Sequence, residues 1–288
     1  MIKIIRQSLL VLLVITCFFP LETKAQITDT SSAGWFIYGI NMGFYFPDNK
    51  PAKFYDGSPQ NSNNLNYIIN NYYYRQQIEQ ELGYALDTTN PYTLPGNLKY
   101  KPTYSIGFYF KITNSKTSGW FMNFNYSKMV AKDIAFVNLD LPNTSFNPRY
   151  RECPIVAKES RYIMDIGYSK TFKLKKSKSG NSLFIEYGIN LTNVKVISHE
   201  IQIGNTIYNM VNQYGNQGYI PGTTTQSGQL VQGGVGLGLF ASGGVMLKFN
   251  EVISVNPGVT LYFHHINLGT WDALRPSANI FVRLIMPF

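Results

Sequence analysis

Charged residues and cysteine are both scarce in this 288-residue sequence. Charged residues make up 14% of the chain and aromatic residues 15%, whereas about a quarter of an ordinary soluble globular protein is charged. The only cysteines, Cys17 and Cys153, are too few for the disulfide framework of a small secreted domain. The composition therefore disfavours an ordinary soluble domain, and its aromatic side chains require some other environment.

A hydrophobic run long enough for a transmembrane helix is also missing. The apolar run Leu9–Phe19 spans roughly 11 residues, against about 20 for a membrane-spanning helix. It follows Lys3 and Arg6 and ends before Ala25, the order of regions in a secretory signal peptide. We expect residues 1–25 to be removed by cleavage near Ala25, which leaves residues 26–33 as a short periplasmic N-terminal segment.

Cleavage at this point removes Cys17 and leaves Cys153 alone, so the mature chain contains no internal disulfide. Lipid attachment at Cys17 is the alternative, but Thr16 before it and Phe18 after it fit a lipoprotein cleavage site poorly. An exported chain of this size without disulfides is held together by buried side chains or by a membrane.

The charges that are present are mainly positive, with 25 Lys and Arg against 16 Asp and Glu and a formal net charge of +9. A positive balance favours anionic partners such as phosphorylated lipid head groups. The charges are scattered apart from one dense run, "KLKKSKSG" at 173–180. We therefore do not predict nucleic-acid binding.

Period-two alternation, the mark of a strand with two different faces, runs through most of the mature chain. Apolar residues alternate with mainly small or polar ones in eight segments: 36–46, 104–112, 120–126, 162–168, 183–191, 235–241, 253–263 and 280–288. We expect strands of roughly 9 to 15 residues, long enough to cross a bilayer when tilted. Because every backbone polar group must be paired in lipid, eight such strands should close on themselves.

The connections between these segments alternate in length. Those after the second, fourth and sixth strands are short, whereas the others are longer, at about 47–98, 139–158, 198–230 and 266–274. Tight periplasmic turns alternating with extracellular loops are typical of outer-membrane barrels. We predict an all-β fold, an eight-stranded antiparallel up-and-down transmembrane β-barrel formed by residues 34–288. A soluble sandwich or lipocalin-like barrel would also alternate, but here the second face carries few charges for a water-exposed exterior.

The signal peptide ending in Lys24-Ala25 before Gln26, the eight alternating segments and the terminal Phe288 resemble the small outer-membrane β-barrel proteins of Bacteroidota. The architecture of that class is similar to that of OmpA-like and OmpX-like barrels. The resemblance covers nearly all of the mature chain. It implies the fold and a location in the Gram-negative cell outer membrane, but no particular activity, because the class is functionally mixed.

The first long connection, about 47–98, is too long for a structureless loop. Within it, apolar residues recur at helical spacing, with Asn64 as a cap candidate and Gly83 as a stop signal. We expect a short helix across the outer mouth, with its apolar stripe packed on the loop or on the barrel rim. The stripe consists of Leu65, Ile68, Ile69 and Tyr72.

Two prolines fall within predicted strands. Pro257 removes a hydrogen-bond donor from the seventh strand, so we expect a bulge or displaced pairing there. Pro287 lacks the same donor, so we expect the ladder of the last strand to end just before it.

The interior of an eight-stranded barrel is just wide enough for its own side chains, which argues against a large water-filled pore. The predicted inward polar set combines Asp165, Glu186 and Arg283 at comparable depth with Lys111 and Lys248 nearer the periplasmic end. Because buried charges must be paired, we predict a salt-bridge network that plugs the lumen. A gate or a proton-coupled site is the alternative interpretation.

No catalytic residue, metal site or cofactor is predicted. His264, His265 and Asp272 lie toward the outer end of the seventh strand and the loop after it. However, no His-x-Ser pair shares one strand face, as a resemblance to lipid A deacylase barrels would require. Adjacent residues of a strand point to opposite faces, so neither His199-Glu200 nor His264-His265 can chelate one ion alone.

The last segment indicates how the chain would be assembled. Its terminal aromatic resembles the insertion signal read by the barrel-assembly machinery, and its lipid-facing residues are Phe288, Met286, Leu284, Val282 and Ile280.

We predict a non-enzymatic structural or interaction barrel that displays extracellular loops or docks to another envelope protein. A narrow small-solute channel is the first alternative, and an outer-leaflet lipid-modifying enzyme is the second. The expected partners are outer-membrane lipid, the assembly machinery during insertion and an envelope protein.

Overall fold

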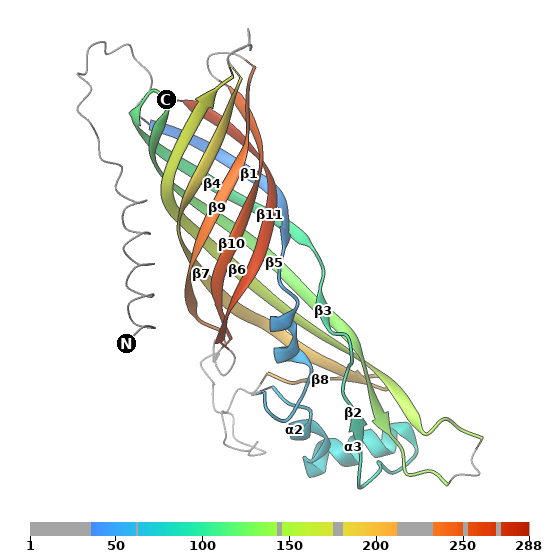
Figure 1. The fold of residues 1–288 in the computed structure, drawn as a ribbon. Helices are drawn as coiled ribbons and strands as arrows, with labels where there is room; N and C mark the ends of the chain where they lie inside the picture. The colour runs from blue at the N-terminus through green and yellow to red at the C-terminus, as the bar shows by residue number, and fades with distance from the viewer. Residues whose placement is uncertain are drawn as a thin grey trace, which may run out of the picture. The chain divides into compact units, whose positions relative to one another are not determined.

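A computed structural model describes residues 36–61, 63–142, 146–174, 181–211, 233–249, 253–268 and 272–287. The predicted signal peptide at 1–25, the segment 26–33 and Phe288 lie outside these residues. Eight long strands form the main body (Figure 1): β1 (Phe36–Phe46), β4 (Thr103–Ser115), β5 (Ser118–Asn138), β6 (Tyr150–Lys173), β7 (Ser182–Ile203), β9 (Val235–Lys248), β10 (Ser254–Asn267) and β11 (Asp272–Pro287).

These strands form a closed antiparallel ring. Each pairs with the next in chain order, and β11 returns to pair with β1, for example through Phe44 opposite Ile280. A closed ring leaves no unpaired sheet edge along the paired stretch. The predicted eight-stranded up-and-down barrel is confirmed.

The two faces of the barrel differ as the alternation predicts. On β11, the outward residues Ile280, Val282 and Leu284 are 38–51% exposed, whereas Asn279 and Arg283 are buried at 3% or less. The same pattern recurs around the ring, where large apolar residues such as Phe108, Leu237 and Leu261 are exposed. The barrel is therefore apolar outside and largely polar inside.

Three strands are much longer than predicted. β5 has 21 residues, β6 has 24 and β7 has 22, so the predicted loops at 139–158 and 198–230 were wrong where strand continues over 150–158 and 198–203. The inward positions of the extension on β5 include Ala131, Ala135 and Val137, and all three are buried. Small residues there, and lysines facing out, gave too weak a hydrophobic contrast to reveal the strand.

The extended strand ends support a second group of elements, which we call the lobe (Figure 1). Besides the ends of β5, β6 and β7, it contains η1 (Lys50–Tyr55), α2 (Asn66–Ile69), α3 (Tyr72–Leu82), β2 (Tyr92–Thr93), β3 (Lys99–Tyr100) and β8 (Thr206–Asn209). Apolar residues from the helices and the sheet pack together in it, including Phe54, Ile69, Ile78, Ile155 and Ile201. No helix in the described part of the chain is long and apolar enough to cross a membrane.

The helix predicted in the first connection is present, but it is divided in two. Leu65, Ile68 and Ile69 of its apolar stripe are buried, whereas Tyr72 is exposed. Gly83 ends α3 with a left-handed φ of 74°, as predicted. The predicted cap Asn64 was wrong: the side chain of Asn71 accepts hydrogen bonds from the backbone amides of Tyr73 and Tyr74. The helical spacing hid the break between α2 and α3.

Replacing the cap residue Asn71 with alanine should destabilise α3 by about 1 kcal/mol, because two terminal amides lose their acceptor. Faster amide hydrogen exchange in α3 would show this effect. Asn70→Ala is the matched control, since Asn70 provides no side-chain cap to this helix. Equal acceleration in both variants would contradict the capping role.

The two prolines behave differently from each other. Pairing of β10 with β9 is interrupted at Asn256 and Pro257 and resumes at Gly258 in the same register, so Pro257 leaves a gap rather than a bulge. Pairing of β10 with β11 continues through Pro257. The expectation for Pro287 was wrong, because Pro287 still lies opposite Ile37 in the last strand pair.

Candidate functional site

A buried ion pair lies at the centre of the lumen. The Arg283 guanidinium on β11 donates to both carboxylate oxygens of Glu186 on β7, over 2.9 and 3.1 Å. Its Nε donates to Asn41 Oδ1 over 2.9 Å, and its guanidinium carbon lies 3.7 Å from the centre of the Tyr109 ring. The Tyr109 hydroxyl donates to Glu186 as well. Both charged residues are at most 2% exposed, so each compensates the buried charge of the other.

Asp165 occupies a separate position in the same lumen. Its carboxylate accepts hydrogen bonds from Asn123, Asn190 and Tyr262 at 2.9, 2.6 and 3.3 Å. Asn41 also donates to Asn123, so a chain of amides links Asp165 to Arg283. Asp165 is therefore satisfied by neutral donors and is joined to the ion pair only indirectly.

The two predicted lysines differ in position. Lys111 is 7% exposed, and its ammonium donates to the Ser169 hydroxyl over 3.0 Å. Lys248, the last residue of β9, is exposed, and its backbone amide donates to Asn181. The structure thus brings Lys111 into the lumen with Glu186 and Arg283, and leaves Lys248 at the surface.

A second buried charge cluster lies where the barrel meets the lobe. Glu159 accepts hydrogen bonds from the hydroxyls of Tyr55 and Tyr100 at 2.6 and 2.8 Å and from Arg161 Nε at 2.8 Å. Arg161 also donates to the Tyr45 hydroxyl over 3.1 Å. Glu159 and Arg161 were not predicted as buried residues, because they lie between the predicted loop at 139–158 and the predicted strand at 162–168. The alternation of 153, 155, 157 and 159 was the available signal.

His264 connects the two clusters through neutral groups. Its Nε2 lies 2.9 Å from Ser277 Oγ, and its Nδ1 lies 3.1 Å from Asn190 Oδ1 and 2.7 Å from Thr192 Oγ1. Tyr45 donates to Ser277 over 3.0 Å. These contacts continue the chain of hydrogen bonds from Glu159 and Arg161 down to Asp165, the amides and Arg283.

The eight-stranded ring is similar in fold to small outer-membrane barrels. Neisserial surface protein A has a TM-score of 0.45 at 7% identity, with 90% of this chain and 100% of that one covered. OprG from Pseudomonas aeruginosa has 0.39 at 11%, covering 88% and 94%. Ail of Yersinia pestis, in complex with the heparin analogue sucrose octasulfate, has 0.31 at 9%, covering 87% and 97%. No family model and no curated protein matches the sequence.

Ser277, His264 and Asn190 follow one another in the order of a nucleophile, a base and an orienting group, because His264 contacts Ser277 through Nε2 and Asn190 through Nδ1. His264 and Asn190 are fully buried and Ser277 is 9% exposed, so a lipid ester has no direct access to the serine. At the rim, His265 pairs with Asp272 over 3.0 Å, apart from this arrangement. No group of three or more His, Cys, Asp or Glu residues that could hold a metal ion occurs within the described ranges.

His199 lies within the lobe, beyond the barrel, and is fully buried against η1. Its Nε2 is 3.0 Å from the Tyr55 carbonyl oxygen. Burial lowers the pKa of His199 to about 3, because the imidazolium loses its hydration; the hydrogen bond to Tyr55 acts in the opposite direction. The pKa in an unfolded chain is about 6.5. The stabilising contribution of neutral His199 to the lobe is therefore fully present above this value and is lost as the pH falls from about 6.5 toward 3.

Acidification should loosen the lobe by on the order of 2 kcal/mol at pH 5, because only the unfolded segment takes up the proton. Limited proteolysis of the purified protein at pH 5 and pH 7.5 would measure this opening. His199→Gln, which keeps a donor but does not titrate, should remove most of the difference. His265→Gln at the exposed rim should not. Identical pH dependence in the His199→Gln variant and the parent protein would contradict this role.

Proposed function

We propose that this chain is a plugged outer-membrane barrel that serves as a non-enzymatic anchor for the lobe, which it presents outside the cell for interaction with another envelope or surface component. The lobe is the observation that supports this function most strongly. Three strands of 21, 24 and 22 residues are far longer than the 9–11 needed to cross a bilayer. Their surplus length serves to hold the helices of the lobe.

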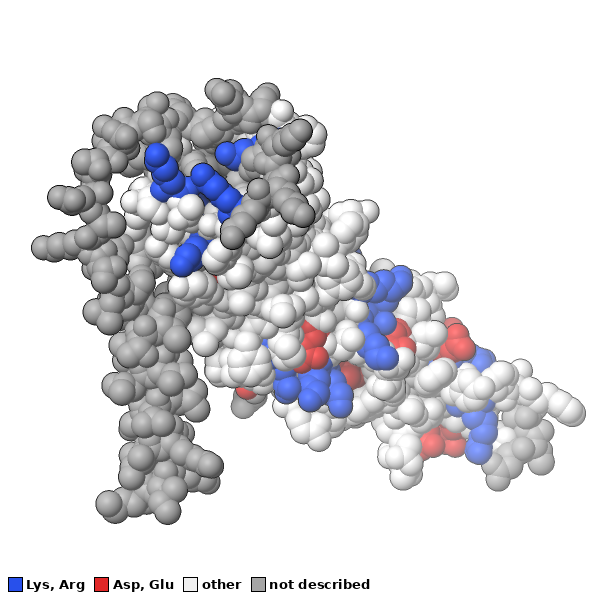
Figure 2. Space-filling model, turned by 45° about the horizontal axis from the view of Figure 1, so that its top comes forward, with Lys and Arg blue, Asp and Glu red and all other residues white. Residues whose placement is uncertain are grey.

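Membrane insertion is supported by the outer surface of the ring. Large apolar side chains are exposed around it. Figure 2 shows a band of uncharged residues on the visible face, with Lys and Arg on one side of it and Lys, Arg, Asp and Glu spread from about the middle to the other end. Such a surface is unfavourable in water and favourable in lipid. The start of β1 and the end of β11 lie at the end of the short turns, opposite the lobe. In the orientation of outer-membrane barrels, that end faces the periplasm and the lobe faces outward.

The predicted export route completes this proposal. Cleavage near Ala25 would release the chain into the periplasm, and the β11 strand with Phe288 would present the insertion signal to the barrel-assembly machinery. A Gram-negative host of the Bacteroidota type remains a prediction from the sequence. Deletion of Phe288 should leave the protein in the periplasmic fraction, whereas substitution of the exposed loop residue Phe146 should not.

A plugged lumen argues against the channel alternative. A continuous series of hydrogen-bonded side chains runs through the lumen. It begins at Glu159, next to the lobe, and ends at Glu186, near the middle of the barrel. Conduction would require this network to break. Planar bilayers containing the purified protein should therefore remain electrically silent. Discrete conductance steps, abolished by unfolding the protein, would support the channel instead.

The enzyme alternative rests on the buried Ser277 and His264. Mass spectrometry of lipid A from cells with the parent gene, with Ser277→Ala and without the gene should give the same acyl chains. A change that depends on Ser277 would overturn the non-enzymatic assignment.

An interaction role should depend on the exposed part of the lobe. Tyr72 and Tyr73, on the first turn of α3, are 67% and 60% exposed. Proximity crosslinking from this helix in intact cells should capture a partner in the parent protein and lose it in the Tyr72→Ser/Tyr73→Ser variant. Tyr104→Ser on the barrel surface is the control. Capture that is unaffected by the lobe variant would contradict this role.

A further inference from the structure

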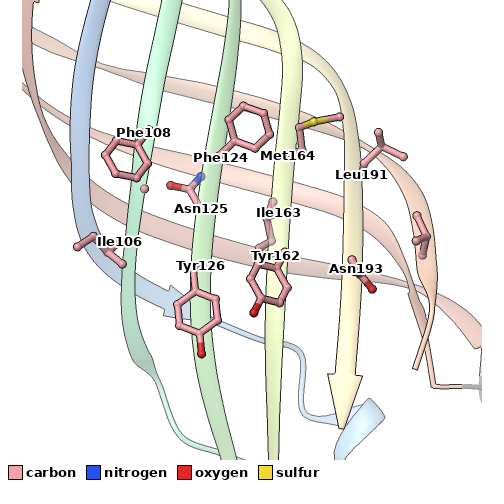
Figure 3. A pocket seen from close by; sticks show the side chains of 12 residues that line it. Ile106, Phe108, Phe124, Asn125, Tyr126, Tyr162, Ile163, Met164, Leu191 and Asn193 are labelled. Carbon is pink, nitrogen blue, oxygen red and sulfur yellow. The ribbon is translucent and has the colours of Figure 1, made fainter. Parts of the chain in front are cut away.

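A hollow of about 440 Å³ lies on the outer face of the barrel across β4, β5, β6 and β7 (Figure 3). Apolar side chains bound it, including Phe108, Phe124, Met164 and Leu191. Its volume is within the range of about 300–1,000 Å³ found for small-molecule sites. In the membrane orientation proposed above, acyl chains are the apolar groups that surround this face.

The hollow ends at a pair of tyrosines on the side of the lobe. Figure 3 shows the hydroxyls of Tyr126 and Tyr162 pointing in the same direction, away from Phe124 and Met164. The centres of the two rings are 5.0 Å apart. Tyrosines with an apolar ring and a polar tip concentrate where lipid tails meet head groups. The head group of a lipid held in the hollow would therefore lie just beyond them.

Three lysines occupy that position on the same outer face. Lys128 follows Tyr126 by two residues, and Lys128 and Lys195 lie on either side of Ser160 in one row across β5, β6 and β7. With neighbouring strands about 4.8 Å apart, their Cα atoms are about 10 Å from each other. Lys158 is two residues farther along β6, opposite Val130. A phosphate between these ammonium groups would lie within reach of all three.

The lysines are available to a ligand. Lys128 and Lys195 are exposed, Lys158 is half-buried, and none of them forms an ion pair within the described residues. Glu200 is the nearest outward carboxylate on β7. It lies opposite Val156, two residues beyond Lys158 along β6 and farther from the hollow than all three lysines. The row next to the tyrosines is therefore positive, whereas the hollow below it is apolar.

From this juxtaposition we infer that the outer face of β4–β7 binds a phosphorylated, acylated lipid of the outer leaflet. An acyl chain lies in the hollow, and a phosphate is held by Lys128, Lys158 and Lys195. The inference rests on the membrane placement proposed above. It adds a defined lipid site on one side of the barrel.

Binding can be measured by native mass spectrometry of the full-length protein in neutral detergent, titrated with lipid A that carries its phosphates or with lipid A from which they have been removed. The parent protein should prefer the phosphorylated form. The Lys128→Gln/Lys158→Gln/Lys195→Gln variant should bind phosphorylated lipid A at least about tenfold more weakly, since each lysine near a charged lipid surface contributes measurably. Its binding of the dephosphorylated form should not change.

A variant with the same loss of charge at the other end of the barrel, Lys116→Gln/Lys170→Gln/Lys248→Gln, is the control and should bind like the parent protein. Leu191→Trp should fill the hollow and weaken the binding of both forms of lipid A equally. Parental binding by the first lysine variant, or equal binding of both lipids by the parent protein, would overturn the inference. The proposed function is tested independently of this lipid site. It is wrong if the parent protein does not insert into lipid vesicles or shows no heat-dependent gel mobility.

Discussion

Replacing Arg283 with methionine should lower the free energy of unfolding by about 3–5 kcal/mol, because Glu186 then remains buried without its counter-charge. Tyr109 would still donate to Glu186 but cannot neutralise it. The measurement is urea unfolding of the protein refolded into lipid vesicles, followed by the loss of the heat-dependent shift on gels. A loss below about 1 kcal/mol would show that water or a proton compensates Glu186.

Two further variants separate the charge from the loss of packing. Arg283→Met/Glu186→Leu removes both charges and should recover much of the lost stability, since an apolar pair can replace a buried ion pair at little cost. Arg275→Met changes the same residue type on the same strand. Arg275 is only partly buried and lies 3.7 Å from Asp48, so this control should cost less than about 1 kcal/mol.

Replacing Glu159 with leucine should detach the lobe from the barrel. Tyr55 of η1 and Tyr100 of β3 both donate to this carboxylate, and Arg161 would be left buried without it. We expect a local cost of about 3 kcal/mol or more. Limited proteolysis should then cleave the segment between β1 and β4 much faster, while the barrel keeps its heat-dependent gel mobility.

Glu152→Leu on the same strand is the matched control for Glu159. Glu152 is exposed on the outward face of β6, so its removal should leave the cleavage rate within about twofold of the parent protein. Equal protection of the Glu159→Leu variant and this control would mean that the apolar core of the lobe holds it without the cluster.

Much of the barrel could be predicted because its two faces differ in chemistry. Along β11, Ile280, Val282 and Leu284 face outward while Arg283 faces inward, and this contrast is visible in the sequence alone. Closure follows from physics, because an open edge cannot persist in lipid. The extensions of β5 and β6 were missed because lysines on their outer face and alanines on their inner face remove that contrast. In the extension of β7 the contrast is reversed, because Val194, Val196 and Ile201 face inward and are buried.

For the lumen, the sequence predicts which residues face inward but not which of them contact one another. The inward positions of Arg283, Glu186 and Asp165 follow from alternation, but their partners depend on strand register and on the stagger of the ring. The register sets Asn41 opposite Arg283 and Asn123 opposite Asp165. The buried role of His264 likewise depends on Ser277 and Thr192, which come from other strands.

The pairing of β5 with β6 runs without a register shift from Ser118 opposite Lys170 to Asn138 opposite Tyr150. A force applied to the tip of the lobe along these strands pulls β5 and β6 together, so the hydrogen bonds of β5 with β4 and of β6 with β7 carry the load in shear. A force applied across them would separate the pairs one after another. The molecule should therefore resist tension along these strands far better than sideways peeling.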